Sequence, residues 1–155
     1  MELDNRILIA FNKFYSNFIK DVKTTHPDIK VTIKKNYKVI DKLSSEYILF
    51  FKSHLSEFLT NIINDDILEL YSKDEFKNKN VIKGLTIDDI VSKIENDIDK
   101  QVFWNYLYIL TVFLYLKNEL ETTEDKTQIE TLFTTVITIL AKIQEGTETD
   151  SLIND

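Results

Sequence analysis

The chain of 155 residues has no cysteine, one proline, two glycines and two histidines. Without cysteine, the chain can have no disulfides, thiolate metal sites or cysteine nucleophiles. Hairpin turns and phosphate-cradling loops depend on glycine and proline, so their scarcity argues against P-loop, dinucleotide-binding and nucleophile-elbow motifs. Helices joined by short polar links can still be built, and the composition therefore favours an all-α fold.

Groups that could perform chemistry are also sparse. His26 and His54 are far apart in the sequence and lack the spacing of a metal-binding motif. Asp65 and Glu69 share a helical face, but they would need a third ligand from elsewhere to hold a cation. Adjacent acids on a helix point in different directions, so they do not form an acid–base couple. The sequence therefore predicts a protein that is not an enzyme and has no cofactor or metal site.

The chain also lacks a long apolar run. Residues 102–116 form its densest hydrophobic segment, which is shorter than the roughly 20 residues needed to cross a bilayer and contains Asn105 and Thr111. The first five residues carry two acids and no basic cluster, unlike a secretory signal peptide. We therefore predict no membrane span and an intracellular location.

The most informative segment is Gly84–Leu116. Thr86 and Asp89 have the spacing of a capping box, which predicts a helix that begins near residue 87. Isoleucine and valine then recur at helical spacing as far as Ile98, which predicts one apolar face. A break is expected near residues 97–100, and the alternative is a continuous join. The helix that follows carries Trp104 and is apolar almost all round, as is typical of a central core helix.

Similar periodicity predicts the other helices. The first spans about Leu3–Thr24 and ends at a corner formed by His26 and Pro27. The second carries Ile29, Ile33, Tyr37, Ile40 and Leu43. A third helix follows Ser44-Ser45, a pair that either ends the second helix or only distorts it. After Asn64-Asp65-Asp66, a short helix holds Ile67, Leu68, Leu70 and Tyr71. The last spans about Asp125–Ile143, with Ile129, Leu132, Phe133, Val136, Leu140 and Ile143 facing inward.

These elements predict a single-domain helical bundle of about six helices, with the Trp104 helix at its centre and the first and last helices packed over it. Residues 1–146 form the helical domain, and Gly146 is placed to close the last helix. Residues 147–155 are polar and acidic, and we expect a flexible tail there. The polar segment Ser72–Lys83 is expected to be a mobile surface loop, which Phe76 and Val81 could pin.

Charge is distributed unevenly along the chain. Residues 1–60 contain ten Lys and Arg against seven acids, whereas residues 61–155 contain nine against nineteen. On a continuous helix, a set of lysines in the first half would form one basic stripe, namely Lys30, Lys34, Lys35, Lys38 and Lys42. This stripe is the candidate interaction surface, for phosphates, an acidic partner or the acidic half of a second copy, and the alternative is a solvated helix face. Direct nucleic-acid binding is disfavoured because the chain is acidic overall and Arg6 is its one arginine.

Four features follow one another within residues 7–116: the corner His26-Pro27-Asp28, an aromatic middle with Tyr47, Phe50 and Phe51, the helix start Gly84-Leu85, and Phe103-Trp104-Asn105-Tyr106-Leu107. In this order they resemble a family of small helical proteins encoded by nucleocytoplasmic large DNA viruses, the giant viruses of algae and protists. The composition, with two alanines and much Ile, Asn and Lys, agrees with an AT-rich genome. The chain departs from the family at Asn105, where a basic residue is expected, and in its last helix. The family brings no catalytic residues.

From these observations we expect a non-enzymatic, virus-encoded interaction protein that binds a protein partner and is either associated with the virion or directed at the host. It would be located in the host cytoplasm or in the virion. One alternative is a self-assembling internal capsid or core component, which the opposite charge of the two halves suggests. Another is a helix-binding modulator of host death or signalling, since helical bundles can present a groove for an amphipathic helix.

Overall fold

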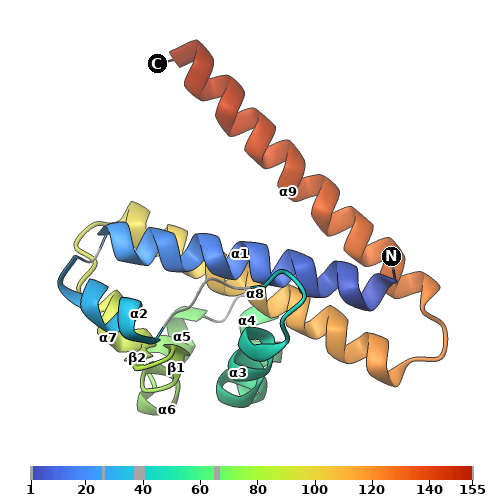
Figure 1. Ribbon diagram of the computed structural model, residues 1–155. Helices are drawn as coiled ribbons and strands as arrows, with labels where there is room; N and C mark the ends of the chain where they lie inside the picture. The colour runs from blue at the N-terminus through green and yellow to red at the C-terminus, as the bar shows by residue number, and fades with distance from the viewer. Residues whose placement is uncertain (1, 26, 37–40, 65–66, 155) are drawn as a thin grey trace.

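The computed structural model describes residues 2–25, 27–36, 41–64 and 67–154, and for residues 143–154 it describes only the course of the helix. In chain order the elements are α1 (Leu3–Thr25), the 3-10 helix η1 (Pro27–Ile29), α2 (Lys30–Asn36), α3 (Glu46–Leu55), the 3-10 helix η2 (Ser56–Phe58), α4 (Leu59–Ile63), α5 (Ile67–Tyr71), α6 (Asp74–Lys77), β1 (Asn80–Ile82), β2 (Leu85–Thr86), α7 (Ile87–Val91), α8 (Asp97–Thr122) and α9 (Thr127–Asn154). The predicted all-α, single-domain class is confirmed (Figure 1).

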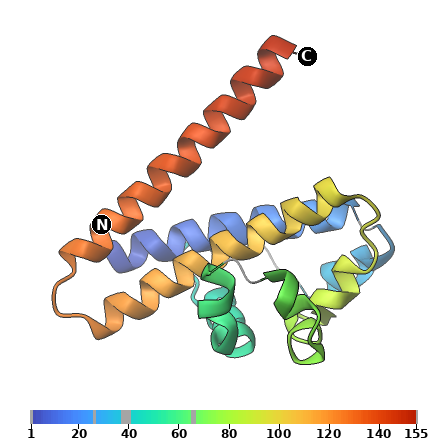
Figure 2. The ribbon, with the colours of Figure 1, turned by 180° about the vertical axis from the view of Figure 1, so that it is seen from behind.

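Two long helices, α1 and α8, form the axis of the molecule and run antiparallel side by side (Figures 1 and 2). Aromatic side chains fill the contact: the rings of Phe14 and Phe113 are 5.6 Å apart, and Phe18 lies 5.5 Å from Phe103. Such ring pairs contribute about 0.5–1.5 kcal/mol beyond the burial of their area. Because α8 contacts α1, α4 and α9, the predicted central place of the Trp104 helix is confirmed.

The shorter elements lie along one side of this axis in two groups, one formed by α3 and α4 and the other by α2, α5, α6, α7 and the hairpin (Figure 2). Their apolar side chains belong to one continuous core with those of α1 and α8. The two serines at 44 and 45 interrupt the helical pattern, since Ser45 is the N-cap residue of α3. Leu43, which the second predicted helix could include, lies instead in a turn beyond α2 and is 46% exposed.

The segment expected to be a mobile loop, Ser72–Lys83, instead contains α6 and β1. Phe76 and Val81 are fully buried and attach the segment to the core, as the sequence suggested. The hydroxyl of the buried Tyr15 also donates to the Val81 carbonyl at 2.7 Å, which ties β1 to α1. The prediction of a loop failed because these distant partners order a polar segment that has little periodicity of its own.

A small antiparallel hairpin, β1–β2, also differs from expectation. Asn80 pairs with Thr86 and Ile82 with Leu85, and the turn between them contains Gly84 at a φ of 81°. This φ lies in the left-handed region, which glycine occupies without steric cost. One of the two glycines is therefore used for the tight turn that the low glycine content argued against.

The capping box at the start of α7 is confirmed: Thr86 Oγ1 accepts from the Asp89 N–H, and the Asp89 carboxylate accepts from the Thr86 N–H. The helix ends at Val91, earlier than predicted, and α8 begins at Asp97 with Asn96 as its N-cap. The break therefore lies before residues 97–100. Ile98 falls in the first turn of α8 and is 77% exposed, so its predicted inward position was wrong.

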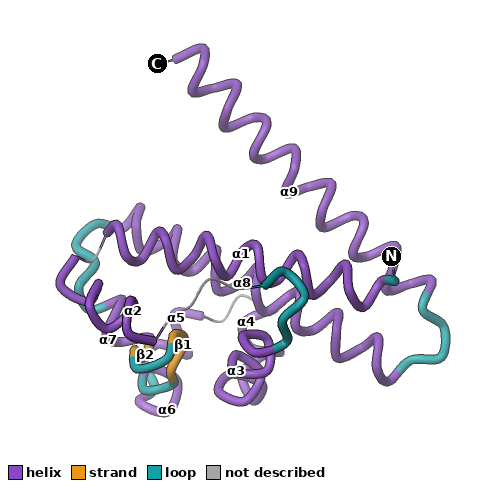
Figure 3. Tube along the Cα trace, in the orientation of Figure 1, coloured by secondary structure: helices purple, strands orange, loops and turns teal. Residues whose placement is uncertain are grey.

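The largest correction concerns α9. The first helix packs over α8 as predicted, but α9 contacts the body, which α1 to α8 form, through residues between Ile129 and Leu140 and diverges from the α1–α8 pair (Figures 1 and 3). Leu132, predicted to face inward, is 43% exposed. The helix also continues through Gly146 to Asn154, so the predicted helix end was wrong. One glycine costs a helix only about 1 kcal/mol, which good helix formers such as Gln144 and Glu145 can offset.

Candidate functional site

The start of α9 is held against the body by apolar and charged contacts. Ile129 and Phe133 are buried, and the Phe133 ring lies 6.1 Å from that of Phe113 in α8. The Arg6 guanidinium lies over the Phe133 ring at 5.3 Å, and its Nη1 is 3.7 Å from the Glu130 carboxylate. These contacts fix the point from which α9 diverges.

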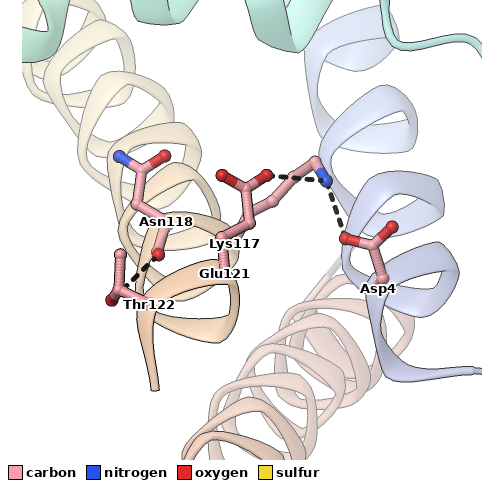
Figure 4. Close-up of polar contacts among 5 residues, drawn as sticks. All are labelled: Asp4, Lys117, Asn118, Glu121 and Thr122. Carbon is pink, nitrogen blue, oxygen red and sulfur yellow. Dashed lines mark hydrogen bonds and ion pairs between the residues drawn. The ribbon is translucent and has the colours of Figure 1, made fainter. Parts of the chain in front are cut away.

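The same end of the body is held together by Lys117 of α8 (Figure 4). Its ammonium lies 2.7 Å from Asp4 Oδ1 in α1 and 3.7 Å from Glu121 Oε1, and its side chain is only 15% exposed. A partly buried lysine between two carboxylates ties the beginning of α1 to the end of α8. This cluster positions the two helices relative to each other.

A groove opens between α8 and the diverging α9. It has a volume of about 540 Å³ and is lined by Asn105, Tyr108, Ile109, Val112, Val136, Ile139 and Leu140. None of these residues carries a formal charge, and most are aliphatic. Ligand and partner clefts typically have volumes of about 300–1,000 Å³ with mainly apolar walls. We therefore take this groove as the candidate functional site.

A second depression has a volume of about 670 Å³ and lies between α8 and the short helices α4 and α5. It shares Asn105 and Tyr108 with the groove and is otherwise lined by Ile62, Ile63, Ile67, Leu68, Glu69, Gln101 and Trp104. The Gln101 amide donates to Asn105 Oδ1 at 2.9 Å, which orders the polar part of the floor. Leu68 lies on the short helix that the sequence predicted there, now α5, and lines this depression with 75% exposure.

Two tyrosines on the body have raised pKa values. Burial, followed by the hydrogen bond to Asp88 and the charge of that carboxylate, raises the pKa of Tyr71 to about 12. Burial, followed by the charge of Asp21, raises the pKa of Tyr106. Both phenols therefore stay protonated at neutral pH, and the phenol of Tyr71 donates a hydrogen bond to Asp88 Oδ1.

The predicted lysine stripe is divided in the structure. Lys30, Lys34 and Lys35 are exposed on α2, whereas Lys38 lies outside the described residues. Lys42 lies in a turn beyond the end of α2 and lines a shallow depression of about 270 Å³ on α1, with Lys13 and Lys20. The buried Asn12 holds this turn, because its amide donates to the Lys42 carbonyl at 2.9 Å and to that of Ser44 at 2.8 Å.

The other candidates for chemistry are not brought together. Asp65 and His26 lie outside the described residues, and His54 packs its ring 4.4 Å from that of Phe50. Within the described parts of the chain, no three His, Asp or Glu side chains are grouped so that they could hold a metal ion. In the same parts of the chain, no helix has both the length and the hydrophobicity that spanning a membrane requires.

Sequence reasoning missed the groove because it placed the whole apolar face of α9 against the core. One signal was present: residues 131–141 contain no charged side chain, yet their apolar residues spread wider than one core-facing stripe.

No protein-family model, curated protein or solved structure matches this chain.

Proposed function

We propose that the protein is a non-enzymatic interaction protein, encoded by a virus, which binds an amphipathic helix of a protein partner in the groove between α8 and α9. The groove itself carries the proposal, because it is open, mostly apolar and bounded by two helices. Binding of one helix between two others is a common recognition mode, in which apolar side chains at i, i+3, i+4 and i+7 fill the groove.

The chemistry of the two large depressions supports binding over catalysis. General acid–base catalysis needs titratable groups that converge on one point. Apart from the phenol of Tyr108, the described residues that line the groove and the adjoining depression supply one ionisable side chain, Glu69. One carboxylate among aliphatic and amide side chains is suited to orienting a partner.

The viral origin rests on the sequence resemblance and on the AT-rich composition. On this proposal the protein acts in the cytoplasm of the infected cell or is carried in the virion. A modulator of host death or signalling would use the groove for a host helix, whereas a self-assembling internal capsid or core component would use it for another copy of the chain.

Titration of the isotope-labelled full-length protein with a synthetic amphipathic helix tests the proposal. The probe is a peptide with leucine at i, i+3, i+4 and i+7 and with alternating glutamate and lysine elsewhere. We expect NMR shifts at Tyr108, Val112 and Ile139, and at least about tenfold weaker binding by Tyr108→Glu, since the new charge would have to be buried.

Tyr115→Glu is the matched control. Tyr115 lies on the same helix and is 40% exposed against 41% for Tyr108, but it does not line the groove. Its substitution should leave the affinity for the peptide unchanged. Equal binding by the parent and both variants, or no binding at millimolar peptide, would refute the proposal.

A further inference from the structure

Beyond Phe133, α9 exposes apolar side chains at the groove, where Ile139 lines it, and on its other side, where Ile137 lies outside the lining. Ile139 is 51% exposed, Leu132 43% and Ile137 36%. These side chains lie within residues 131–141, which contain no charge. A neutral, partly apolar helix face of this kind indicates a contact with another surface.

The threonines of residues 131–141 also suit a face that another molecule covers. The hydroxyls of Thr131, Thr135 and Thr138 each donate to the backbone carbonyl four residues earlier, at 3.0, 2.9 and 2.8 Å. With their hydroxyls bonded inside the helix, these side chains need no outside hydrogen-bond partner and present their methyl groups. The face can therefore be covered without leaving buried polar groups unpaired.

The same stretch is a weak helix by itself. It consists mainly of Thr, Ile and Val, each of which costs a helix roughly 0.5 kcal/mol relative to alanine. Helices with poor intrinsic propensity depend on packing for their stability. Beyond Phe133 the body offers α9 only partial packing, with Val136 and Leu140 half-buried.

We infer that the groove between α8 and α9 receives α9 of a second copy of this chain, so that two copies exchange α9 contacts in a two-fold dimer: each helix stays on its own body and also packs into the groove of the other copy. The inference rests on the proposed function, in which the groove receives a helix. Within one chain α9 already lies along α8, since Val136 and Leu140 line the groove opposite Ile109 and Val112. The partner's α9 would contact the groove-lining residues of α8 that α9 of the same chain leaves uncovered.

The absence of charge on the two surfaces and the area that they would bury both fit a second copy of the chain. The lining carries no charge and neither do residues 131–141, so no ion is buried without a partner. With a rise of 1.5 Å per residue, residues 127–142 are about 24 Å long, and half the circumference of such a helix covers roughly 400 Å². Each copy would bury one helix face and one groove, about 800 Å², so the dimer would bury roughly 1,600 Å² in total, which is the size of a standard stable interface.

Sedimentation of the full chain from low micromolar to millimolar concentration measures this association. We expect a dimer that persists at high salt, because apolar burial is not screened by ions. Ile139→Glu should raise the dissociation constant at least about tenfold. Ile137→Glu, on the other side of α9 and outside the groove lining, should change it less than about twofold. A dimer that salt dissociates, or equal effects of the two variants, would overturn the inference.

Exchange itself can be tested by cross-linking, because the chain has no cysteine of its own. When Tyr108→Cys and Ile139→Cys proteins are mixed and mildly oxidised, we expect a disulfide between chains. The pair Tyr108→Cys and Ile137→Cys is the control and should cross-link much less, whereas equal yields would contradict exchange.

The peptide titration separates the two proposals. A chain that stays monomeric at millimolar concentration but binds the leucine-rich peptide in the groove would refute the exchange and leave the proposed function standing. A monomer that binds neither would refute both.

Discussion

At the scale of single residues, Tyr71 connects several elements through one side chain. Its hydroxyl donates to Asp88 Oδ1 at 2.7 Å, its ring lies 5.5 Å from that of Trp104, and the Lys77 ammonium lies 5.5 Å from its centroid. Tyr71 thereby joins α5 to α7 and α8. Its raised pKa records how strongly the folded state favours the protonated form.

Tyr71→Phe should change how stability depends on alkaline pH. The folded pKa is about 12 and the unfolded value is about 10, so the contribution of the phenol is present below pH 10 and is lost as pH rises toward 12. The difference in unfolding free energy between parent and variant should therefore shrink over this interval, as measured by urea unfolding at several pH values. At neutral pH the lost hydrogen bond should cost about 1 kcal/mol.

Asp88→Asn is the informative companion variant. It keeps an oxygen acceptor for the phenol but removes the negative charge, so the pKa of Tyr71 should fall below its parent value. Ultraviolet titration of the tyrosines measures this shift. An unchanged titration in Asp88→Asn would show that the carboxylate does not raise the pKa of the phenol.

At the scale of elements, α7 shows how a short helix is held. It has only five residues, fewer than an isolated helix needs, but Ile87 and Ile90 are fully buried and the capping box satisfies its first N–H groups. Its start was predictable because the spacing of Thr86 and Asp89 is a local signal. Its early end was not, because the turn that follows depends on distant contacts, such as the burial of Ile94 and the ion pair between Lys93 and Asp28.

Thr86→Ala should lower the unfolding free energy by about 1 kcal/mol, because the Asp89 N–H loses its capping acceptor. Urea unfolding at neutral pH measures the change. Thr123→Ala is the matched control, since Thr123 is also half-buried but lies at the C-terminal end of α8. Similar losses in the two variants would argue against a specific role for the capping box.

At the scale of the whole molecule, the body and the distal part of α9 should differ in their contributions to stability. Among the α9 side chains that the structure describes, the buried ones, Ile129 and Phe133, lie in the first two turns, and the half-buried ones, Val136 and Leu140, come soon after. Residues 147–155, which the sequence predicts to be a flexible acidic tail, follow beyond these contacts. The flexibility of this segment remains a prediction.

Deletion of residues 147–155 should therefore shift the melting temperature by no more than about 2 °C, as followed by circular dichroism. Phe133→Ala is the contrasting variant, because a buried phenylalanine contributes about 3–5 kcal/mol and its loss should lower the melting temperature by many degrees. A deletion as damaging as Phe133→Ala would mean that the C-terminal segment belongs to the core.

The sequence by itself determined the helical class, the long first helix, the capped start at Thr86 and the core position of Trp104. These features depend on local spacing and composition, which act within one or two helical turns. The tertiary structure alone decided how the lysines divide between α2 and the turn that holds Lys42, how Asn12 and Tyr15 hold distant segments, and where α9 leaves the body. Each of these depends on contacts between residues far apart in the chain, and an apolar helix face has the same sequence pattern whether its own core or another molecule covers it.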